Sequence, residues 1–216
     1  AKPPTDPKPA DPPPVNQGTI VFTVHDSKGD RVPCRIHLRD PAGKSIEPRG
    51  APYWHDHFVC DGRVEVGGLK PGAYRYAVER GPEFPRVGSQ VILPDVKDSR
   101  VVLDVRLDRV IDLNHLGWYS GDLHIHRPIE QIESLMAAED LNIAPVITWW
   151  NNQNLWSSRP IPADTSYLPS PTRWYDIMAG EDERGGGALL YFHLAKPLPI
   201  TPAKRESPAS VVFLDG

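Results

Sequence analysis

The stretch Gly121-Asp122-Leu123-His124-Ile125-His126 alternates polar and apolar residues at the end of an expected strand. Side chains of a strand point alternately to its two faces, so Asp122, His124 and His126 share one face. The two apolar residues between them then point into the core. Two imidazoles at this spacing can hold one divalent metal ion or one each of a close pair, and a nearby carboxylate can orient a ring. The stretch therefore predicts a metal-binding strand end.

The residues that follow this stretch favour an α/β fold. A helix is expected from Pro128 to Leu141, because Pro and acidic residues open it and apolar residues recur at helical spacing. Further strands are expected over residues 143–148, 174–180, 189–194 and 211–214. The order strand, helix, strand favours a parallel sheet or barrel, and α/β barrels carry their active sites at the carboxyl ends of strands.

The chain before this region divides into two parts. Residues 1–17 contain seven Pro among small and charged residues, which favours an extended polyproline II linker. Residues 18–109 contain short β-rich runs separated by turns, which predicts a β-sandwich. The expected domains are thus a linker (1–17), a sandwich (18–109) and a third part (110–216).

Composition narrows the classes of partner. The 216 residues include 24 basic and 28 acidic side chains, and the net charge of -4 gives no electrostatic case for nucleic-acid binding. No apolar run approaches the roughly 18 residues of a membrane-spanning helix. We therefore expect no nucleic-acid partner and no membrane span. The expected partner, which follows from the metal-binding stretch and the tryptophans described below, is a small-molecule or glycan substrate.

Two smaller features leave alternatives open. Cys34 and Cys60 each share a strand face with apolar residues, so they are either buried free thiols or a disulfide that needs an oxidising compartment. His55 and His57 are either surface-loop histidines or a second metal or substrate contact, because an H-x-H on a strand points both rings to one side.

The sandwich region resembles the carboxypeptidase-regulatory-like, transthyretin-like modules. The residues that carry the resemblance are the opening strand at 18–21, the hairpin at 26–33, and the run Leu69-Lys70-Pro71-Gly72-Ala73-Tyr74. The run is similar to the L-x-P-G-x-Y signature of those modules. The resemblance implies a spacer or docking role.

Residues 121–126 resemble the first motif of the PHP (polymerase and histidinol phosphatase) superfamily, within it the exported CehA/McbA-like metallohydrolases. Residues 178–183 resemble that family's G-x-E strand end, whose Glu bridges metals, and residues 190–194 its next strand, which carries a ligand His. The resemblance implies a PHP-type (β/α) barrel and divalent ions such as Zn²⁺, Mn²⁺ or Fe²⁺. The implied ligands are His124, His126, Glu181 and His193.

The sequence departs from this family in two ways. Where the family has T-D-H-N, this chain has Thr148-Trp149-Trp150-Asn151, and indole cannot ligate a metal. Trp149, Trp150 and Trp156 are therefore expected either to stack on a sugar or aromatic ring or to fill a barrel core. The family's later motifs would lie beyond residue 216, so the expected barrel is partial. A fragment, a nicked product or a second polypeptide that completes the barrel would each account for this.

The donor residues, together with this resemblance, imply a metal-dependent hydrolase of an exported type that acts on a phosphoester or another ester. A bound metal ion would lower the pKa of water from 15.7 to about 7. In this scheme Glu181 bridges the metals, Asp122 orients a ligand histidine and Arg127 meets an anionic group of the substrate. The alternative is a non-catalytic extracellular module that binds a glycan or a protein and retains a degenerate metal site.

Overall fold

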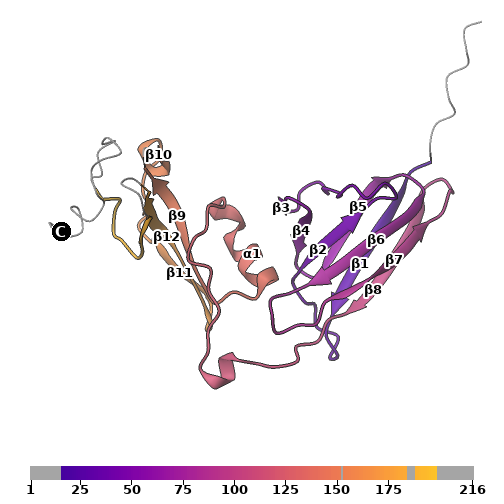
Figure 1. The fold of residues 1–216 in the computed structure, drawn as a ribbon, viewed down its shortest axis with the longest axis horizontal. Coiled ribbons are helices and arrows are strands. Elements are labelled where there is room, and N and C mark those ends of the chain that lie inside the picture. Colours follow the sequence, from indigo (N-terminus) through magenta and orange to yellow (C-terminus); the bar gives the residue numbers. More distant parts are fainter. Residues whose placement is uncertain (1–15, 152, 184–187, 199–216) are drawn as a thin grey trace, which may run out of the picture.

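The structure is a computed structural model that describes residues 16–151, 153–183 and 188–198. Most of the proline-rich segment 1–17 and the strand expected at 211–214 lie outside the described residues. The molecule has two lobes side by side, joined by the segment that follows Arg106 (Figure 1). None of the helices among the described residues is long and apolar enough to cross a membrane.

The first lobe consists of two sheets packed face to face. The three-stranded sheet has the order β5 (Arg63–Leu69), β1 (Gly18–His25), β8 (Ser99–Arg106). The five-stranded sheet has the order β3 (Tyr53–Trp54), β4 (His57–Cys60), β2 (Cys34–Arg39), β6 (Gly72–Glu79), β7 (Val87–Leu93). β1 runs antiparallel to β5 but parallel to β8.

Alternation of side chains builds the core between these sheets. In β2 every second residue is buried, so Cys34, Ile36 and Leu38 face inward and the residues between them face outward. Phe22 of β1 and Phe58 of β4 are also fully buried in this core. The outward face of β2 and β4 turns toward the second lobe, where α1 contacts both strands.

The second lobe is built on a mixed sheet with the order β10 (Gln153–Asn154), β9 (Ile143–Trp150), β12 (Arg173–Asp182), β11 (Ser166–Ser170). β13 (Leu189–Tyr191) also pairs with β12. β9 and β12 are parallel, whereas the β10, β11 and β13 pairings are antiparallel. The helical segments are η1 (Asn114–Leu116), η2 (Ile129–Gln131), α1 (Ile132–Glu139) and η3 (Leu155–Ser157).

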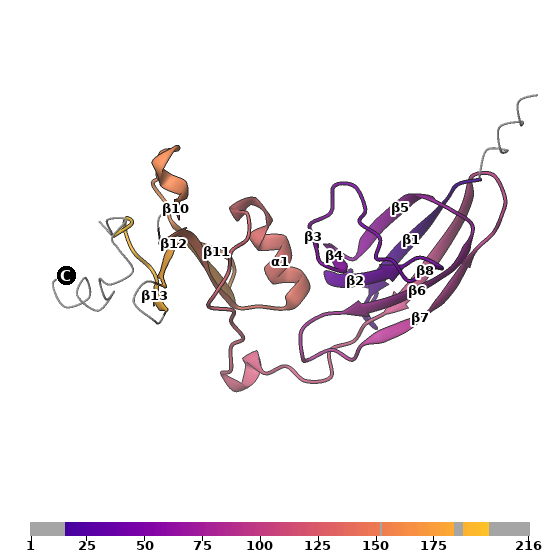
Figure 2. The ribbon, with the colours of Figure 1, turned by 45° about the horizontal axis from the view of Figure 1, so that its top comes forward.

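α1 lies between the second sheet and the sandwich (Figure 2). Its buried Ile132 and Met136 pack with Ala144 and Val146 of β9 and with Ile177 of β12. The helix ends at Asp140, which adopts the left-handed conformation with φ 56° and serves as the C-cap. The helix thus joins the second sheet to the outer face of β2 and β4.

The predicted fold class is wrong, because the described residues form no (β/α) barrel. Strands hold 46% and helices 10% of the described residues, and α1 is the sole α-helix among them. A barrel needs a helix after each parallel strand, but β9 and β12 each continue into an antiparallel strand. The chain between β9 and β11 contains Asn, Ser, Pro and Trp without helical spacing, so it forms short β and 3-10 elements instead.

The strand expected to end at His126 is replaced by two isolated β-bridges. Residues 114–116 form η1, and the segment after it pairs with β9 through two isolated parallel bridges, Gly121 with Ile143 and Ile125 with Val146. Between the bridges the Asp122 carboxylate accepts the backbone N–H of His124 at 3.0 Å. This local bond competes with regular strand pairing. The segment nevertheless runs parallel to β9, as a β-α-β unit requires.

Candidate metal centre

Two histidines and one buried glutamate meet where the 121–126 segment passes the end of β12. Nε2 of His126 lies 3.0 Å from a carboxylate oxygen of Glu181, and Nε2 of His124 lies 3.1 Å from each of the two oxygens. The two imidazole centroids are 5.1 Å apart. One donor atom from each residue lies within 4.8 Å of the others, so the three can hold one metal ion.

The fold explains why these residues meet although 55 positions separate His126 from Glu181. The Ile125–Val146 bridge fixes the 121–126 segment on one side of β9, and β12 lies on β9 in parallel register. Glu181 pairs with Trp150 at the carboxyl end of both strands. The histidines and the glutamate therefore converge at the same end of the sheet.

The Glu181 carboxylate is buried with few compensating partners. Its side chain is 2% exposed, and its Oε1 atom has no partner with hydrogen-bond geometry among the described residues. A buried carboxylate is costly unless a cation or several hydrogen bonds offset it. Two imidazole nitrogens and a carboxylate form a donor set that suits Zn²⁺ and related divalent ions. The residues present therefore fit a metal ion.

The centre is open on the histidine side. The side chains of His124 and His126 are 50% and 35% exposed, whereas Glu181 closes the opposite side. Catalytic zinc sites commonly have three protein ligands and leave a position for water or substrate, whereas structural sites are closed by four. The arrangement matches the open type.

Asp122 and Arg127 lie beside the centre. The Asp122 carboxylate bonds the backbone of His124, so it positions the peptide of a ligand residue. The Arg127 guanidinium lies 4.8 Å from the ring centroid of Trp54 and donates to Gln131 at 2.9 Å and to the carbonyl of Tyr53 at 3.3 Å. Burial lowers the pKa of Arg127. The sandwich thus holds an arginine next to a candidate ligand.

His193, which was expected to be a ligand, lies apart from this cluster. Its Nδ1 is 3.1 Å from the Ser166 hydroxyl, its ring is 5.8 Å from that of Trp174, and its N–H donates to Asp176. The direction of β13 explains this position. β13 is antiparallel to β12, so the chain after Tyr191 runs back toward the start of β12 and away from Glu181.

The three tryptophans expected to stack on a substrate have different environments. Trp149 is 4% exposed and stacks on Tyr191 at 5.6 Å, so it belongs to the core. Trp156 donates from Nε1 to Thr148, and the Arg159 guanidinium lies 5.1 Å from its ring centroid. Trp150 meets His126 edge to face at 4.9 Å and borders a cavity. Of the three, Trp150 is placed to contact a ligand at the centre.

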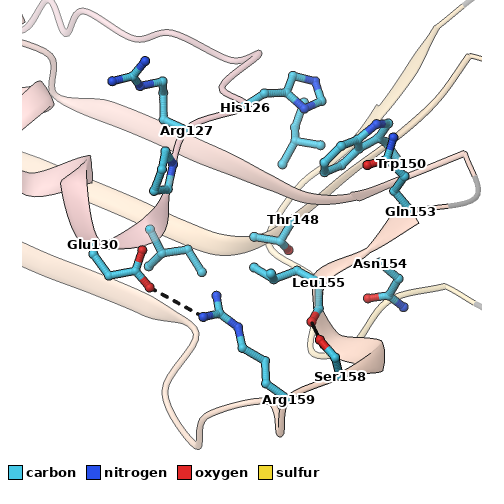
Figure 3. Close-up of a pocket in the computed structure, with 13 residues that line it drawn as sticks. His126, Arg127, Glu130, Thr148, Trp150, Gln153, Asn154, Leu155, Ser158 and Arg159 are labelled. Carbon is cyan, nitrogen blue, oxygen red and sulfur yellow. Dashed lines mark hydrogen bonds and ion pairs between the residues drawn. The ribbon is translucent and has the colours of Figure 1, made fainter. Parts of the chain in front are cut away.

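Two cavities border the centre, and His126 and Arg127 line both. The first has a volume of about 590 Å³. Figure 3 shows His126 and Trp150 at one end of it and the Glu130–Arg159 ion pair at the other. The second, about 390 Å³, lies between the lobes and adds Trp54 and His57 from the sandwich to His124 and His126. Sequence reasoning did not assign Trp54 or Arg159 to the site, because no pattern links them to the motif along the chain.

A second group in the described residues can also hold a metal ion. It consists of His37, Asp56 and His57 on the sandwich. His57 was considered from the sequence together with His55, but His55 is exposed and is not part of the group. His37 was missed, because only the antiparallel pairing of β2 with β4 brings it beside His57, and Asp56 was not assigned although it precedes His57 in the sequence.

Comparisons with known proteins assign no family. No protein-family model matches the sequence, and no curated protein matches it. Among solved structures, one match is GBS52, the minor pilin in the gram-positive pathogen Streptococcus agalactiae, at 15% identity and a TM-score of 0.36. That match covers 45% of this chain and 47% of the pilin. Another is BcpA, the major pilin subunit of Bacillus cereus, at 17% identity and a TM-score of 0.29, with 44% and 30% covered. The chain thus spans less than half the length of either pilin.

Proposed function

We propose that the second lobe is a metal-dependent hydrolase that acts on an anionic ester, with a phosphoester as the preferred class. The observation that carries this proposal is the meeting of the His124 and His126 imidazoles on the buried Glu181 carboxylate. These three residues would hold a divalent ion, which would supply Lewis-acid chemistry and a water of lowered pKa. The open side toward the cavities leaves room for water and substrate.

Two arginines that line the larger cavity favour an anionic substrate. Arg127 and Arg159 line the 590 Å³ cavity, and the Nε atom of each is buried without a hydrogen-bond partner among the described residues. Guanidinium groups bind phosphate and carboxylate through paired N–H donors. Arg127 is next to a candidate ligand, so it can hold the anionic group of an ester against the centre. The exposed Glu130 side chain pairs with Arg159 and partly neutralises its positive charge.

The apolar wall of the same cavity orients the rest of the substrate. Trp150, Leu155, Ile129 and Ile147 border it, so a ligand with an aromatic or sugar ring can bury one face there. We infer that the substrate joins an anionic group to such a ring. We further infer that this activity belongs to an exported protein, as the resemblance of residues 121–126 implies.

The test measures metal content and hydrolysis together. The full chain, loaded with Zn²⁺ or Mn²⁺, is assayed with p-nitrophenyl phosphate, bis-p-nitrophenyl phosphate and p-nitrophenyl acetate. We expect hydrolysis by the wild type and a loss of at least about 100-fold in both metal affinity and turnover for Glu181→Gln and for His124→Ala/His126→Ala. His193→Ala serves as the matched control and keeps both properties. Absence of turnover by the metal-loaded wild type on all three esters would overturn the proposal.

A second function, a glycan-binding or protein-binding module, is favoured by the position of Trp150. Its ring stands at the cavity edge and leaves an apolar surface beside polar side chains, as sugar-binding sites do. This function predicts ligand binding that survives removal of metal by EDTA and that Trp150→Ala abolishes. Binding of an oligosaccharide panel, measured by calorimetry with and without EDTA, separates the two functions.

A further inference from the structure

The outward face of the five-stranded sheet carries a second cluster of metal-binding side chains. His37 lies on β2, His57 begins β4, and Asp56 immediately precedes that strand. The core positions of β2 alternate with outward ones, so His37 points away from the sandwich core. β4 pairs antiparallel with β2, with Ile36 opposite Phe58, so His57 is the next neighbour of His37 on the same face. Their ring centroids are 5.2 Å apart.

Both imidazoles turn the same nitrogen toward one carboxylate. Nδ1 of His37 lies 3.3 Å from Oδ2 of Asp56, and Nδ1 of His57 lies 3.2 Å from Oδ1. The two histidine side chains are each 18% exposed and that of Asp56 is 39% exposed. The group is therefore largely shielded, yet an ion can reach it from solvent. Its three donor atoms lie within 4.8 Å of one another.

A second layer of polar groups supports these three residues. The buried Nε2 of His37 faces the Glu79 carboxylate at 3.8 Å and has no hydrogen-bond partner among the described residues. A metal-ligating histidine commonly presents its other ring nitrogen to a carboxylate, which fixes the tautomer. Arg39 donates at 2.9 Å to Oδ2 of Asp56, the oxygen that faces His37, and so orients the carboxylate with Oδ1 toward His57.

The arginines around this cluster lower its affinity for a cation. Arg35 and Arg86 bind Glu79 at 2.5 and 2.8 Å, and Arg39 binds Asp56. These guanidinium groups orient the carboxylates but also repel a divalent ion. We therefore expect weaker binding at this cluster than at His124, His126 and Glu181.

We propose that His37, Asp56 and His57 form a second divalent-metal site, with Zn²⁺ as the best-suited ion. Two imidazole nitrogens and one carboxylate oxygen match the ligand preference of zinc. The ion would fix the β3–β4 hairpin, whose Trp54 and Tyr53 contact Arg127 beside the first centre. The site therefore ties the sandwich to the cavity between the lobes. It does not depend on the proposed hydrolase activity.

The test counts ions on the full chain. Zn²⁺ titration by calorimetry and metal analysis after dialysis are made on the wild type, His37→Ala/His57→Ala, His124→Ala/His126→Ala and the fourfold variant. We expect two bound ions for the wild type, one for each double variant and none for the fourfold variant. His55→Ala is the matched control, because His55 lies in the same H-x-H and outside the cluster, and it keeps both ions.

The outcomes separate this site from the proposed function. An unchanged ion count in His37→Ala/His57→Ala overturns the second site, whatever happens at the first. Loss of an ion in that variant together with no hydrolysis by the wild type rejects the hydrolase and keeps the second site. A measurement on the wild type covers the case in which the variant does not fold. Zn²⁺ must then shift the Nδ1 resonances of His37 and His57 in ¹⁵N NMR spectra, and unshifted resonances overturn the proposal.

Discussion

At the scale of single residues, Gly180 decides where Trp149 packs. A Cβ atom at Gly180 would lie 2.0 Å from the Trp149 ring, far inside van der Waals contact. The missing side chain lets the indole lie flat against β12 and stack on Tyr191. Trp149 therefore packs in the core of the sheet against Gly180, the residue before the candidate ligand Glu181.

Gly180→Ala should destabilise the protein by about 1–3 kcal/mol, because the added methyl group overpacks the Trp149 contact. Gly67→Ala is the control, since its Cβ would meet Thr19 Oγ1 at an ordinary 3.5 Å and should change stability by about 0.5 kcal/mol or less. Urea unfolding followed by tryptophan fluorescence measures both. An unchanged midpoint for Gly180→Ala would mean that Trp149 packs elsewhere.

At the same scale, sequence reasoning found the three side chains that meet but not all of their surroundings. The G-x-E resemblance pointed to Glu181 and the H-x-H spacing to His124 and His126, and all three converge in the structure. His193 was misplaced because a strand's direction is not encoded locally, and β13 runs antiparallel to its neighbour. The role of His124, His126 and Glu181 as metal ligands stays a prediction.

At the scale of elements, β2 and β4 place two thiols directly opposite each other. Cys34 pairs with Cys60, and both are free, with their sulfur atoms 3.7 Å apart. The hydrogen bond with Cys60, together with burial, raises the pKa of Cys34. The same hydrogen bond lowers the pKa of Cys60, which is also the more exposed of the two thiols.

Mild oxidation with diamide should join this pair into a disulfide. The Cys60 thiolate attacks the azo group, the Cys34 sulfur displaces the adduct, and the hydrazine product carries away both hydrogens. Closing this loop should raise the free energy of unfolding by about 3 kcal/mol. Intact mass analysis shows the loss of two hydrogens, and thermal melting gives the gain. Cys60→Ser is the control and should show neither. No mass change in the wild type would contradict the prediction.

The elements of the second lobe were partly readable from the sequence. The helix and the strands β9 and β12 lie where apolar spacing predicts them, at Ile132–Glu139, Ile143–Trp150 and Arg173–Asp182. The short strands β10 and β11 were missed, because their residues are polar or lack alternation. Since these short strands are antiparallel, their absence from the prediction made the sheet resemble the start of a parallel barrel.

At the scale of the whole molecule, one carboxylate ties the two lobes together. Asp140, whose side chain is 10% exposed, binds Arg80 at 2.9 Å, Arg109 at 2.6 Å and Arg173 at 3.2 Å. Arg80 follows the sandwich strand β6, Arg109 lies in the connection and Arg173 begins β12. Burial raises the pKa of Asp140, but Arg80 and Arg109 outweigh it and the pKa is lowered.

Asp140→Asn should cost about 3–5 kcal/mol at neutral pH, because the partly buried Arg80 and Arg173 lose their counter-charge and Arg109 keeps only that of Glu83. The folded-state pKa is depressed, so the contribution is present above the unfolded value of about 3.9 and is lost as pH falls through the folded one. Urea unfolding of both proteins at pH 7 and below pH 4 should give a difference that shrinks in acid. A difference that does not change with pH would contradict the role of the charge. Asparagine tolerates the left-handed backbone, which limits the change to charge.

The parallel pairing of β1 with β8 has a kinetic consequence. Gly18 lies opposite Ser99 and His25 opposite Arg106, so the sheet of the first strand is complete only after the last strand of the sandwich has been made. Contacts this distant in the chain slow folding, because loop closure must come before the contacts that stabilise it. During synthesis the edge of β1 opposite β5 stays unpaired until β8 has been made. Its completion also anchors the connection to the second lobe, because the Leu107 N–H donates to His25.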